Sequence, residues 1–252
     1  MPARLCKKTE ARIMTMYCAG AVVRAICAEL GISQKTIYNV LDRNAMQGRR
    51  HAIHHPHTDI FDTINTEEKA YWLGFLAADG HLAQYQIQLE LASKDAKQVR
   101  DFAEFMGVPE NVRTYSRGST AVWVGSKHLV EQVCAFDYHR LTPALAKHFW
   151  RGVVDGDGSV RWQRAVTSRR GGDWVVVLVG SQTMVAGFLQ FLDANGLRQN
   201  RSKLQRSIWR VDYFGREARR IIRLLYQDAI VALERKLTSA VAAMAFECEV
   251  AA

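Results

Sequence analysis

The feature that most constrains this chain is a stretch that occurs twice and ends each time in an aspartate followed by a glycine. The first copy reads WLGFLAADG (residues 72–80) and the second reads WRGVVDGDG (residues 150–158). Both copies are apolar runs with small residues on one side, which let two helix backbones approach closely. A match of this kind indicates an internal duplication, so the chain is expected to contain two structural repeats.

The segments that follow the two copies match as well. Each copy is followed by strands, by a helix with an F-x-x-F pair, by two further strands and by a last helix. A tryptophan stands in the second of the later strands, Trp123 in the first copy and Trp209 in the second. One repeat alone does not close a core, whereas two can. We therefore expect an α+β fold of two pseudo-symmetric αββαββα repeats, residues 66–145 and residues 146–252.

The predicted strand QYQIQLEL (residues 84–91) alternates strictly between polar and apolar residues. Its apolar residues are Tyr85, Ile87, Leu89 and Leu91, and its polar residues are three glutamines and a glutamate. Strict alternation means that one face packs on helices while the other meets solvent or a ligand. Glutamine both donates and accepts hydrogen bonds, which suits the edges of bases, and the second repeat is richer in arginine.

An ordinary solvated face explains one such strand, but matching strands in both repeats favour a sheet that binds a polyanion. The net charge of +9, from 34 Lys and Arg against 25 Asp and Glu, is typical of nucleic-acid-binding proteins and equally of basic proteins without such a partner. The candidate DNA-contacting residues of the repeats are Gln84, Gln86, Gln88, Arg113, Arg117, Arg161, Gln163, Arg164, Arg169, Arg170, Arg201, Lys203, Gln205 and Arg206.

Residues 1–46 predict three short helices, with stops at Gly20 and Gly31 and an N-cap at Ser33. This pattern resembles the helix-turn-helix of the resolvase/invertase group of DNA-binding proteins. The alternative is an ordinary three-helix bundle, but the basic and amide-rich face of the last helix favours DNA binding. The candidate contact residues are Gln34, Lys35, Thr36, Tyr38, Asn39 and Arg43.

Residues 47–65 show no periodicity and contain Pro56, so they are expected to be a linker. Four of the eight histidines of the chain lie in this segment: His51, His54, His55 and His57. A zinc site is conceivable there. A solvated basic linker fits better, because the proline disrupts helical spacing and no cysteine is near.

The five cysteines are scattered and odd in number, which argues against a disulfide framework or a zinc ribbon and favours a reducing compartment. No apolar run reaches the roughly 20 residues that span a bilayer, and the first residues lack the apolar core of a signal peptide. We expect a protein of the cytoplasm, or of the nucleus or an organelle, and not a secreted one.

Each repeated stretch is expected to end as a helix whose C-terminus carries a carboxylate, Asp79 or Asp157. A helix C-terminus already has the negative end of the helix dipole, so two carboxylates that meet there repel unless a cation joins them. Hard divalent cations such as Mg²⁺ take oxygen ligands of this kind and support phosphodiester hydrolysis. An EF-hand loop from Asp155 is excluded, because Val160 and Val166 replace its required glycine and glutamate. The alternative is a helix that simply ends at a glycine, with no function for the aspartate. This explains a single Asp-Gly pair well, but it explains two matching copies less well.

At these two stretches the chain resembles the single-chain, two-motif LAGLIDADG homing endonucleases, and the resemblance covers residues 66–246. It implies that Asp79 and Asp157 bind the metal together with the main-chain carbonyls of Ala78 and Gly156. It also implies Mg²⁺-dependent cleavage of both strands of DNA across a narrowed minor groove, by a monomer whose two sheets form a saddle on the duplex. Such enzymes serve the mobility of an intron or an intein.

The resemblance further implies a catalytic basic residue near the end of each repeat, for which Lys236 and the weaker match Arg140 are the candidates. The chain departs from the family pattern at four motif positions: Ala77 replaces a common aspartate, and Trp72, Trp150 and Arg151 are bulky for a helix interface. Two alternatives share this fold, a non-cleaving DNA-binding transcriptional regulator and an RNA-splicing maturase. The presence of both motif acids favours the endonuclease over the regulator.

Overall fold

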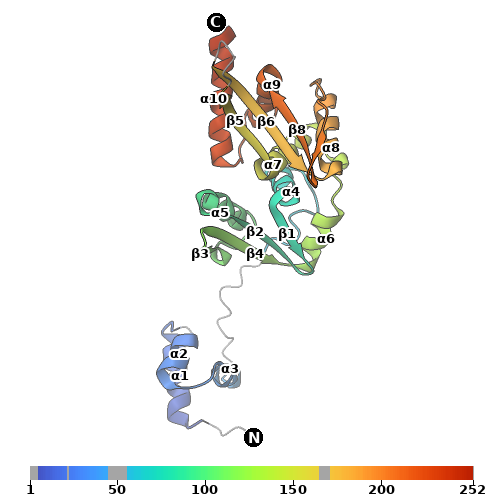
Figure 1. The fold of residues 1–252 in the computed structure, drawn as a ribbon. Helices are drawn as coiled ribbons and strands as arrows, with labels where there is room; N and C mark the ends of the chain where they lie inside the picture. The colour runs from blue at the N-terminus through green and yellow to red at the C-terminus, as the bar shows by residue number, and fades with distance from the viewer. Residues whose placement is uncertain (1–4, 22, 45–55, 165–170, 252) are drawn as a thin grey trace. The chain divides into compact units, whose positions relative to one another are not determined.

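The computed structural model describes residues 5–21, 23–44, 56–164 and 171–251, and it divides the chain into two compact units. The first unit is Met1–His54 and the second is His55–Ala252 (Figure 1). Each unit has its own hydrophobic core, so the two are described separately.

The small unit contains three helices, α1 (Lys7–Cys18), α2 (Val23–Leu30) and α3 (Gln34–Arg43). The chain turns at Gly31 with a φ of +65°, a conformation that glycine adopts without strain. The Ser33 side chain accepts a hydrogen bond from the Thr36 amide and caps α3, as the sequence predicts. The core consists of Ile13, Tyr17, Ile26, Ile37, Val40 and Leu41.

The large unit contains two copies of the same element order, which confirms the predicted α+β class and the αββαββα repeats. The elements of the first copy are α4 (Glu67–Asp79), β1 (Gly80–Ala83), β2 (Gln86–Ala92), α5 (Ala96–Phe105), β3 (Arg113–Tyr115), β4 (Ser119–Gly125) and α6 (Lys127–Ala135). The elements of the second copy are α7 (Pro143–Asp157), β5 (Gly158–Arg164), β6 (Gly172–Gly180), α8 (Gln182–Ala194), β7 (Lys203–Gln205), β8 (Ile208–Phe214) and α9 (Gly215–Tyr226). A further helix, α10 (Glu234–Ala251), follows the second copy and runs along β5 (Figure 1).

Each copy forms one antiparallel sheet, and the two sheets have the same strand order, β1-β2-β4-β3 and β5-β6-β8-β7. Helices α4 and α7 lie side by side between the two sheets (Figure 1). The register is equivalent at the start of each sheet, where Gly80 pairs with Leu89 and Gly158 pairs with Leu178. The duplication seen in the sequence is therefore a duplication of structure.

The bulky tryptophans of the two motifs point into their own repeats. The Trp72 ring lies 5.0 Å from Phe102, and the Trp150 ring lies 5.5 Å from Phe188. These phenylalanines belong to the F-x-x-F pairs of α5 and α8. The tryptophans therefore join each motif helix to the helix that covers its sheet, and the α4–α7 contact is left to smaller residues.

Two details of the strands differ from the sequence reading. Gln84 and Tyr85 form the turn between β1 and β2, so the strand predicted from residue 84 begins at Gln86. Trp123 and Trp209 are not equivalent. Trp123 lies opposite Gln88 on the face of its sheet away from the core, whereas Trp209 packs against the core.

The described end of the segment that the sequence analysis interprets as a linker packs against the large unit. Phe61 is buried in the core of the large unit, and the His57 imidazole hydrogen-bonds the Phe105 carbonyl at 2.9 Å. The other three histidines of this segment lie outside the described residues.

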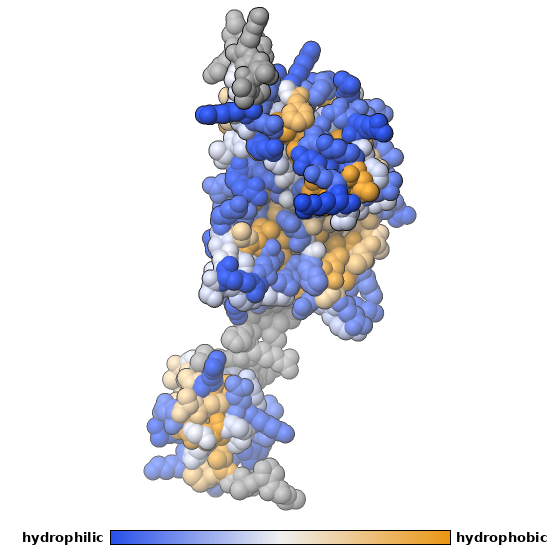
Figure 2. All heavy atoms as spheres, in the orientation of Figure 1, coloured by the Kyte–Doolittle hydropathy of each residue, from blue (hydrophilic) through white to orange (hydrophobic). Residues whose placement is uncertain are grey.

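Helix α7 begins at Pro143, slightly before the start expected for the second repeat. In the view of Figure 2, the surface of the large unit is mainly hydrophilic, with separate apolar patches.

Candidate active site at the ends of two packed helices

Helices α4 and α7 are in backbone contact through their glycines. A Cβ atom added at Gly74 would collide with the Phe149 carbonyl oxygen, and one added at Gly152 would collide with the Tyr71 carbonyl oxygen. Only glycine therefore fits at these two positions. The close approach that the small residues predict is present, and it brings the C-terminal ends of the two helices together.

The carboxylates of Asp79 and Asp157 lie next to each other where these ends meet. A Cβ atom added at Gly156 would collide with the Ala78 Cβ and would lie 3.3 Å from Asp79 Oδ2. Burial and the negative charge of Asp79 raise the pKa of Asp157 to about 6, against the opposing effect of Lys236. Desolvation also raises the pKa of Asp79, which Lys236 and Arg235 oppose. The charge of Asp79 thus acts on Asp157, and nearby cationic side chains offset part of the negative charge of the two groups.

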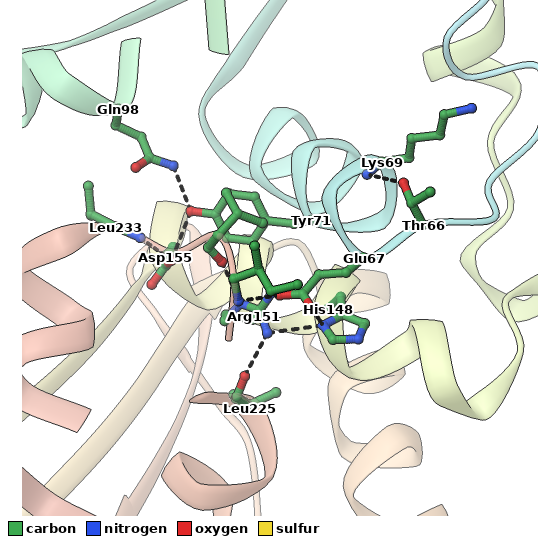
Figure 3. A network of polar contacts seen from close by, with 12 residues as sticks. Thr66, Glu67, Lys69, Tyr71, Gln98, His148, Arg151, Asp155, Leu225 and Leu233 are labelled. Atoms are coloured by element: carbon green, nitrogen blue, oxygen red, sulfur yellow. Dashed lines mark hydrogen bonds and ion pairs between the residues drawn. The ribbon is translucent and has the colours of Figure 1, made fainter. Parts of the chain in front are cut away.

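Asp155, two residues before Asp157, has a different role. It is 1 % exposed, and it accepts hydrogen bonds from Tyr71 Oη (2.9 Å), Tyr226 Oη (2.6 Å) and the Leu233 amide (2.7 Å) (Figure 3). All of these donors are protein groups, so the carboxylate is fully used in holding α4, α9 and the start of α10 against α7. Asp155 is a structural residue of the site.

Arg151 extends this network along α7. Its guanidinium is fully buried and donates to the carbonyls of Val231 (2.9 Å) and Leu225 (3.0 Å) and to Glu67 Oε1 (2.5 Å) (Figure 3). It also lies 3.0 Å from His148 Nδ1. The bulky arginine of the second motif therefore ties α7 to the first residue of α4 and to the loop after α9.

Lys236 is the one predicted catalytic base that the structure brings to the two carboxylates. Its side chain is almost fully buried, and its ammonium donates to the carbonyls of Val154 (2.7 Å), Asp155 (2.5 Å) and Gly158 (2.7 Å). The Gly156 carbonyl lies 3.5 Å away. Burial lowers the pKa of Lys236 to about 8. The ammonium thus binds the end of α7 itself.

Arg140, the candidate from the first repeat, lies elsewhere. Its side chain is exposed and has one long ion pair, 3.8 Å to Asp137. It lines a cavity of about 630 Å³ together with Phe61 and His128. Among the described residues, no hydrogen bond or ion pair joins Arg140 to Asp79 or Asp157.

The open face of the first sheet carries part of the predicted contact set. The strand register places Gln86 and Gln88 on this face, with His81 and Trp123 opposite Gln88. Gln84 lies in the adjoining turn. His81 and Trp123 were missed by the sequence reading, because only the register shows which face they occupy.

The charged residues of this face are partly neutralised. Arg117 pairs with Glu90 and stacks on the Tyr115 ring at 4.4 Å. Arg113 is exposed and donates to the Glu110 carbonyl at 2.8 Å. The first sheet therefore offers amides and aromatic rings more than free positive charge.

The open face of the second sheet is more basic. Alternation along the strands puts Arg161, Gln163, Lys203 and Gln205 on one face, while Arg164 at the end of β5 falls on the opposite side. Arg210 shares the open face and donates hydrogen bonds from its Nε and from a terminal nitrogen to the Asp212 carboxylate. Four further predicted contact residues are not in the strands that the structure describes: Arg201 and Arg206 are exposed in loops, and Arg169 and Arg170 are not among the described residues.

The alternation within IWRVDYF (residues 208–214) is the signal that could have identified Arg210.

In the small unit, α3 presents most of the predicted contact residues to solvent. Those that are exposed are Gln34, Lys35, Tyr38, Asn39 and Arg43. Thr36 is partly buried against Ser33, and Arg43 pairs with Glu10 at 3.1 Å.

No helix among the described residues is long and apolar enough to cross a membrane. No protein-family model matches the chain, and no curated protein is similar to it in sequence. Solved structures do match. The LAGLIDADG meganuclease I-AabMI bound to uncleaved DNA aligns with a TM-score of 0.52 and 9% identity, over 73% of this chain and 92% of that one. The chain has the LAGLIDADG fold.

Two further structures with this fold give the same picture. The meganuclease I-SmaMI bound to uncleaveable DNA aligns with a TM-score of 0.53 and 10% identity, over 74% of this chain and 91% of that chain. The I-LtrWI LAGLIDADG homing endonuclease bound to target DNA aligns with a TM-score of 0.52 and 10% identity, over 76% and 92%. At these identities the likeness establishes the LAGLIDADG fold, and the chemistry has to be argued from the side chains.

Proposed function

We propose that this protein is a LAGLIDADG homing endonuclease that hydrolyses a phosphodiester bond in each strand of a specific DNA site. The observation that carries the proposal is the proximity of two acidic residues, Asp79 and Asp157, at the joined ends of α4 and α7, where the charge of Asp79 raises the pKa of Asp157. Two like charges held together raise each other's pKa, an arrangement that is unfavourable without a cation. The structural neighbours with this fold are described as bound to DNA, which supports the same conclusion.

The donor set at this site fits Mg²⁺. Asp79 and Asp157 would hold the ion together with the main-chain carbonyls of Ala78 and Gly156, which supplies the hard oxygen ligands that Mg²⁺ prefers. When bound, the ion would stabilise the attacking and leaving oxygens of the phosphodiester. Among the described residues, no three histidine, cysteine, aspartate or glutamate side chains gather elsewhere as a metal site. The neighbour I-SmaMI is also described bound to its DNA target in the presence of calcium ions.

The two open sheet faces would bind the duplex on either side of this site, as a saddle over a narrowed minor groove. One chain holds both faces, so a monomer would read both half-sites. Gln86 and Gln88 of the first sheet suit adenine, whereas Arg161 of the second suits guanine, and each good pair discriminates by about 1–3 kcal/mol. The two half-sites are therefore expected to differ, the second being richer in guanine.

The small unit would add a DNA contact through α3, whose exposed face carries Gln34, Lys35 and Asn39. Deleting residues 1–54 removes a unit with its own core, so the large unit should still fold. The footprint on DNA should shorten, and the dependence of affinity on salt should weaken by about 0.9 log units per lost phosphate contact. An unchanged footprint and salt slope would show that α3 does not touch DNA.

The test of the proposed function is incubation with a randomised plasmid library and Mg²⁺, followed by sequencing of the cut ends. The protein should cut one sequence family and leave short 3′ overhangs, and chelation of the metal should stop the reaction. Asp79→Asn and Asp157→Asn should each abolish cutting with little loss of DNA affinity, because an amide is a weaker cation ligand. Asp193→Asn, at an exposed position in α8, is the matched control.

Three results would contradict parts of this proposal. Specific DNA binding without cutting in any divalent cation would identify a regulator on the same fold. Near-normal cutting by either aspartate variant would show that the two-carboxylate site is not the active site. Preference for a structured RNA over duplex DNA would favour a maturase.

A further inference from the structure

Each open sheet face carries a carboxylate among its amides and cations, Glu90 on the first face and Asp212 on the second. The strand register places Glu90 on the face of Gln86 and Gln88, and it places Asp212 on the face of Arg210. A carboxylate there repels the phosphates of a duplex and so weakens the binding of every sequence. Its presence on both faces proposed to bind DNA therefore needs a further explanation.

Glu90 holds the side chains around it. Its Oε1 accepts hydrogen bonds from Arg117 Nε at 3.1 Å and from a terminal nitrogen of the same guanidinium. The same oxygen accepts from Ser119 Oγ at 2.5 Å, and Oε2 accepts from Gln88 Nε2 at 3.1 Å. Hydrogen bonds from Ser119 and Arg117 lower the pKa of Glu90, so this carboxyl is ionised at neutral pH. The carboxylate thus decides where an exposed guanidinium points.

Asp212 holds Arg210 in the same way. Arg210 donates to Asp212 Oδ1 from Nε at 2.9 Å and from a terminal nitrogen at 2.5 Å. Lys203 Nζ lies 3.7 Å from Asp212 Oδ2. The hydrogen bonds from Arg210 lower the pKa of Asp212, which is therefore ionised at neutral pH as well. On each face, one carboxylate thus binds the Nε and one terminal nitrogen of one arginine.

The duplication does not account for this likeness. By the strand register, the equivalent of Glu90 in the second repeat is Val179, and the equivalent of Asp212 in the first repeat is Trp123. The acid therefore lies on β2 in one repeat and on β8 in the other. A similar pair at two places that do not correspond indicates a shared task rather than a shared origin.

An arginine held in this manner keeps the donors that read a guanine. A guanidinium has five N–H donors in one plane, and the carboxylate takes one on Nε and one on a terminal nitrogen. The remaining three include the pair on the outer edge, which suits the O6 and N7 acceptors of guanine in the major groove. An arginine without such a partner can turn to the nearest phosphate, a contact that carries no sequence information.

We propose that Glu90 and Asp212 are positioning residues for base recognition. Each directs one arginine, Arg117 or Arg210, to a guanine of its own half-site and withholds it from phosphates. The inference deepens the proposed DNA-binding function and rests on it. The two acids weaken binding to all DNA, but they weaken binding to wrong sequences more, so they favour specificity over affinity.

The test selects bound duplexes from a random DNA library with Glu90→Gln, with Asp212→Asn and with the unaltered protein. Ca²⁺ replaces Mg²⁺, as for I-SmaMI on its uncleaved target. Glu90→Gln should reduce the preference for guanine at one position of one half-site from at least about tenfold to less than about threefold, and Asp212→Asn should do so in the other half-site. The control Glu131→Gln removes the same charge from an exposed pair with Lys127 on α6 and should alter neither half-site.

The released arginine should bind phosphate instead. Each of the variants Glu90→Gln and Asp212→Asn should therefore bind a duplex of unrelated sequence about three- to tenfold more tightly at about 0.1 M salt, with a log–log salt slope steeper by about 0.9. The slope for Glu131→Gln should stay that of the unaltered protein. A purely structural role of the two acids would not move specific and non-specific binding in opposite directions.

Replacing the arginines identifies the base positions that they read. Arg117→Lys should relax the same position as Glu90→Gln, and Arg210→Lys the same position as Asp212→Asn, because an ammonium does not replace the planar guanidinium. Each double variant should relax that position no further than either single variant. The two lysine variants also take the place of an amide variant that fails to fold.

Three outcomes separate this inference from the proposed endonuclease. An unchanged guanine preference in either amide variant, or relaxation of both half-sites by one variant, would overturn the inference even if the protein cuts DNA. The expected shifts in a protein that cuts no DNA would retain the inference and reject the endonuclease. An unaltered protein that prefers no duplex sequence would also overturn the positioning role.

Discussion

Helices α4 and α7 occupy equivalent places in the two repeats, but they are held in different ways. The contact between them is nearly symmetrical, since Gly74 and Gly152 each face the backbone of the other helix. The surroundings are not symmetrical. Where α7 has Arg151 and Asp155, α4 has Leu73 and Ala77 at the same motif positions.

The difference shows that the two copies of the motif share the close helix contact but not the polar network that stabilises one of the helices. Close packing needs small residues on both helices, so both copies keep them. The polar network needs partners, and for Asp155 these are Tyr71 of α4, Tyr226 of α9 and the Leu233 amide. A buried carboxylate is stable where its donors are fixed. Ala77, at the position on α4 that corresponds to Asp155, is exposed. The following four predictions test this comparison.

The largest effect is expected at Asp155. Replacing it with alanine, the residue that α4 has at this position, leaves Tyr226 Oη and the Leu233 amide without an acceptor and should lower the free energy of unfolding by about 3–5 kcal/mol. The reverse change, Ala77→Asp, puts a carboxylate at an exposed position and should change it by less than about 0.5 kcal/mol. Urea unfolding measures both. Similar losses in the two variants would show that the helices are supported alike.

A slightly smaller and symmetrical effect is expected at the helix contact. Gly74→Ala and Gly152→Ala should each lower the free energy of unfolding by about 3 kcal/mol, because the new methyl group meets backbone and the helices must separate. This loss outweighs the gain in helix propensity from glycine to alanine, about 1 kcal/mol. Gly125→Ala, whose new Cβ would lie 3.9 Å from the Tyr85 carbonyl oxygen, serves as the control. A harmless change at either helix glycine would contradict the backbone contact.

The polar support of α7 also predicts acid sensitivity. Burial and the neighbouring Arg151, opposed by Glu67, lower the pKa of His148 to about 4. As the pH falls from the ordinary value near 6.5 towards 4, the unfolded chain takes up a proton that the folded protein resists. The contribution of His148 to stability should therefore fall through this range, by roughly 1–3 kcal/mol, while the raised pKa of Asp157 acts in the opposite direction.

His148→Gln keeps an acceptor for Arg151 and removes the titration, so urea midpoints between pH 4.5 and 6.5 should become less dependent on pH. The lowered pKa of Glu67 acts in the same direction at lower pH and should remain in the variant. An unchanged slope between pH 4.5 and 6.5 would assign the acid sensitivity to other groups.

The smallest effect is expected at Arg140. It was the candidate base of the first repeat, yet its only ion pair among the described residues is exposed and 3.8 Å long. Such pairs contribute about 0–1 kcal/mol, so Arg140→Ala should alter stability by less than that and cleavage by less than about twofold. Strand-resolved cleavage of a plasmid that carries the target site measures the rate for each strand. A large loss in either strand would restore Arg140 to the catalytic set.

Much of the fold could be read from the sequence because its signals are local. The duplicated motif, the alternation of Ile87 and Leu89 and the glycine stops around α2 all report on neighbours within a few residues. The features that the sequence did not reveal depend on the register between strands, which decides the face of the sheet that each residue occupies. Trp123 and Trp209 stand in equivalent strands, β4 and β8, but at different places in the register. Leu89 pairs with Val122, which directly precedes Trp123, whereas the equivalent Leu178 pairs with Val211, which follows Trp209 by two residues.

The sequence by itself determined that two helices with glycine faces pack together and that each ends in an aspartate, because these properties depend on residue size, periodicity and the chain ends of helices. Only the tertiary structure decided which aspartate is buried and which pair of acids meets. It also decided that Lys236, far along the chain, reaches the carbonyls of α7 while Arg140 does not reach α4. These outcomes depend on which distant segments cover each helix end, and burial, charge and hydrogen bonding act on neighbours in space rather than in sequence.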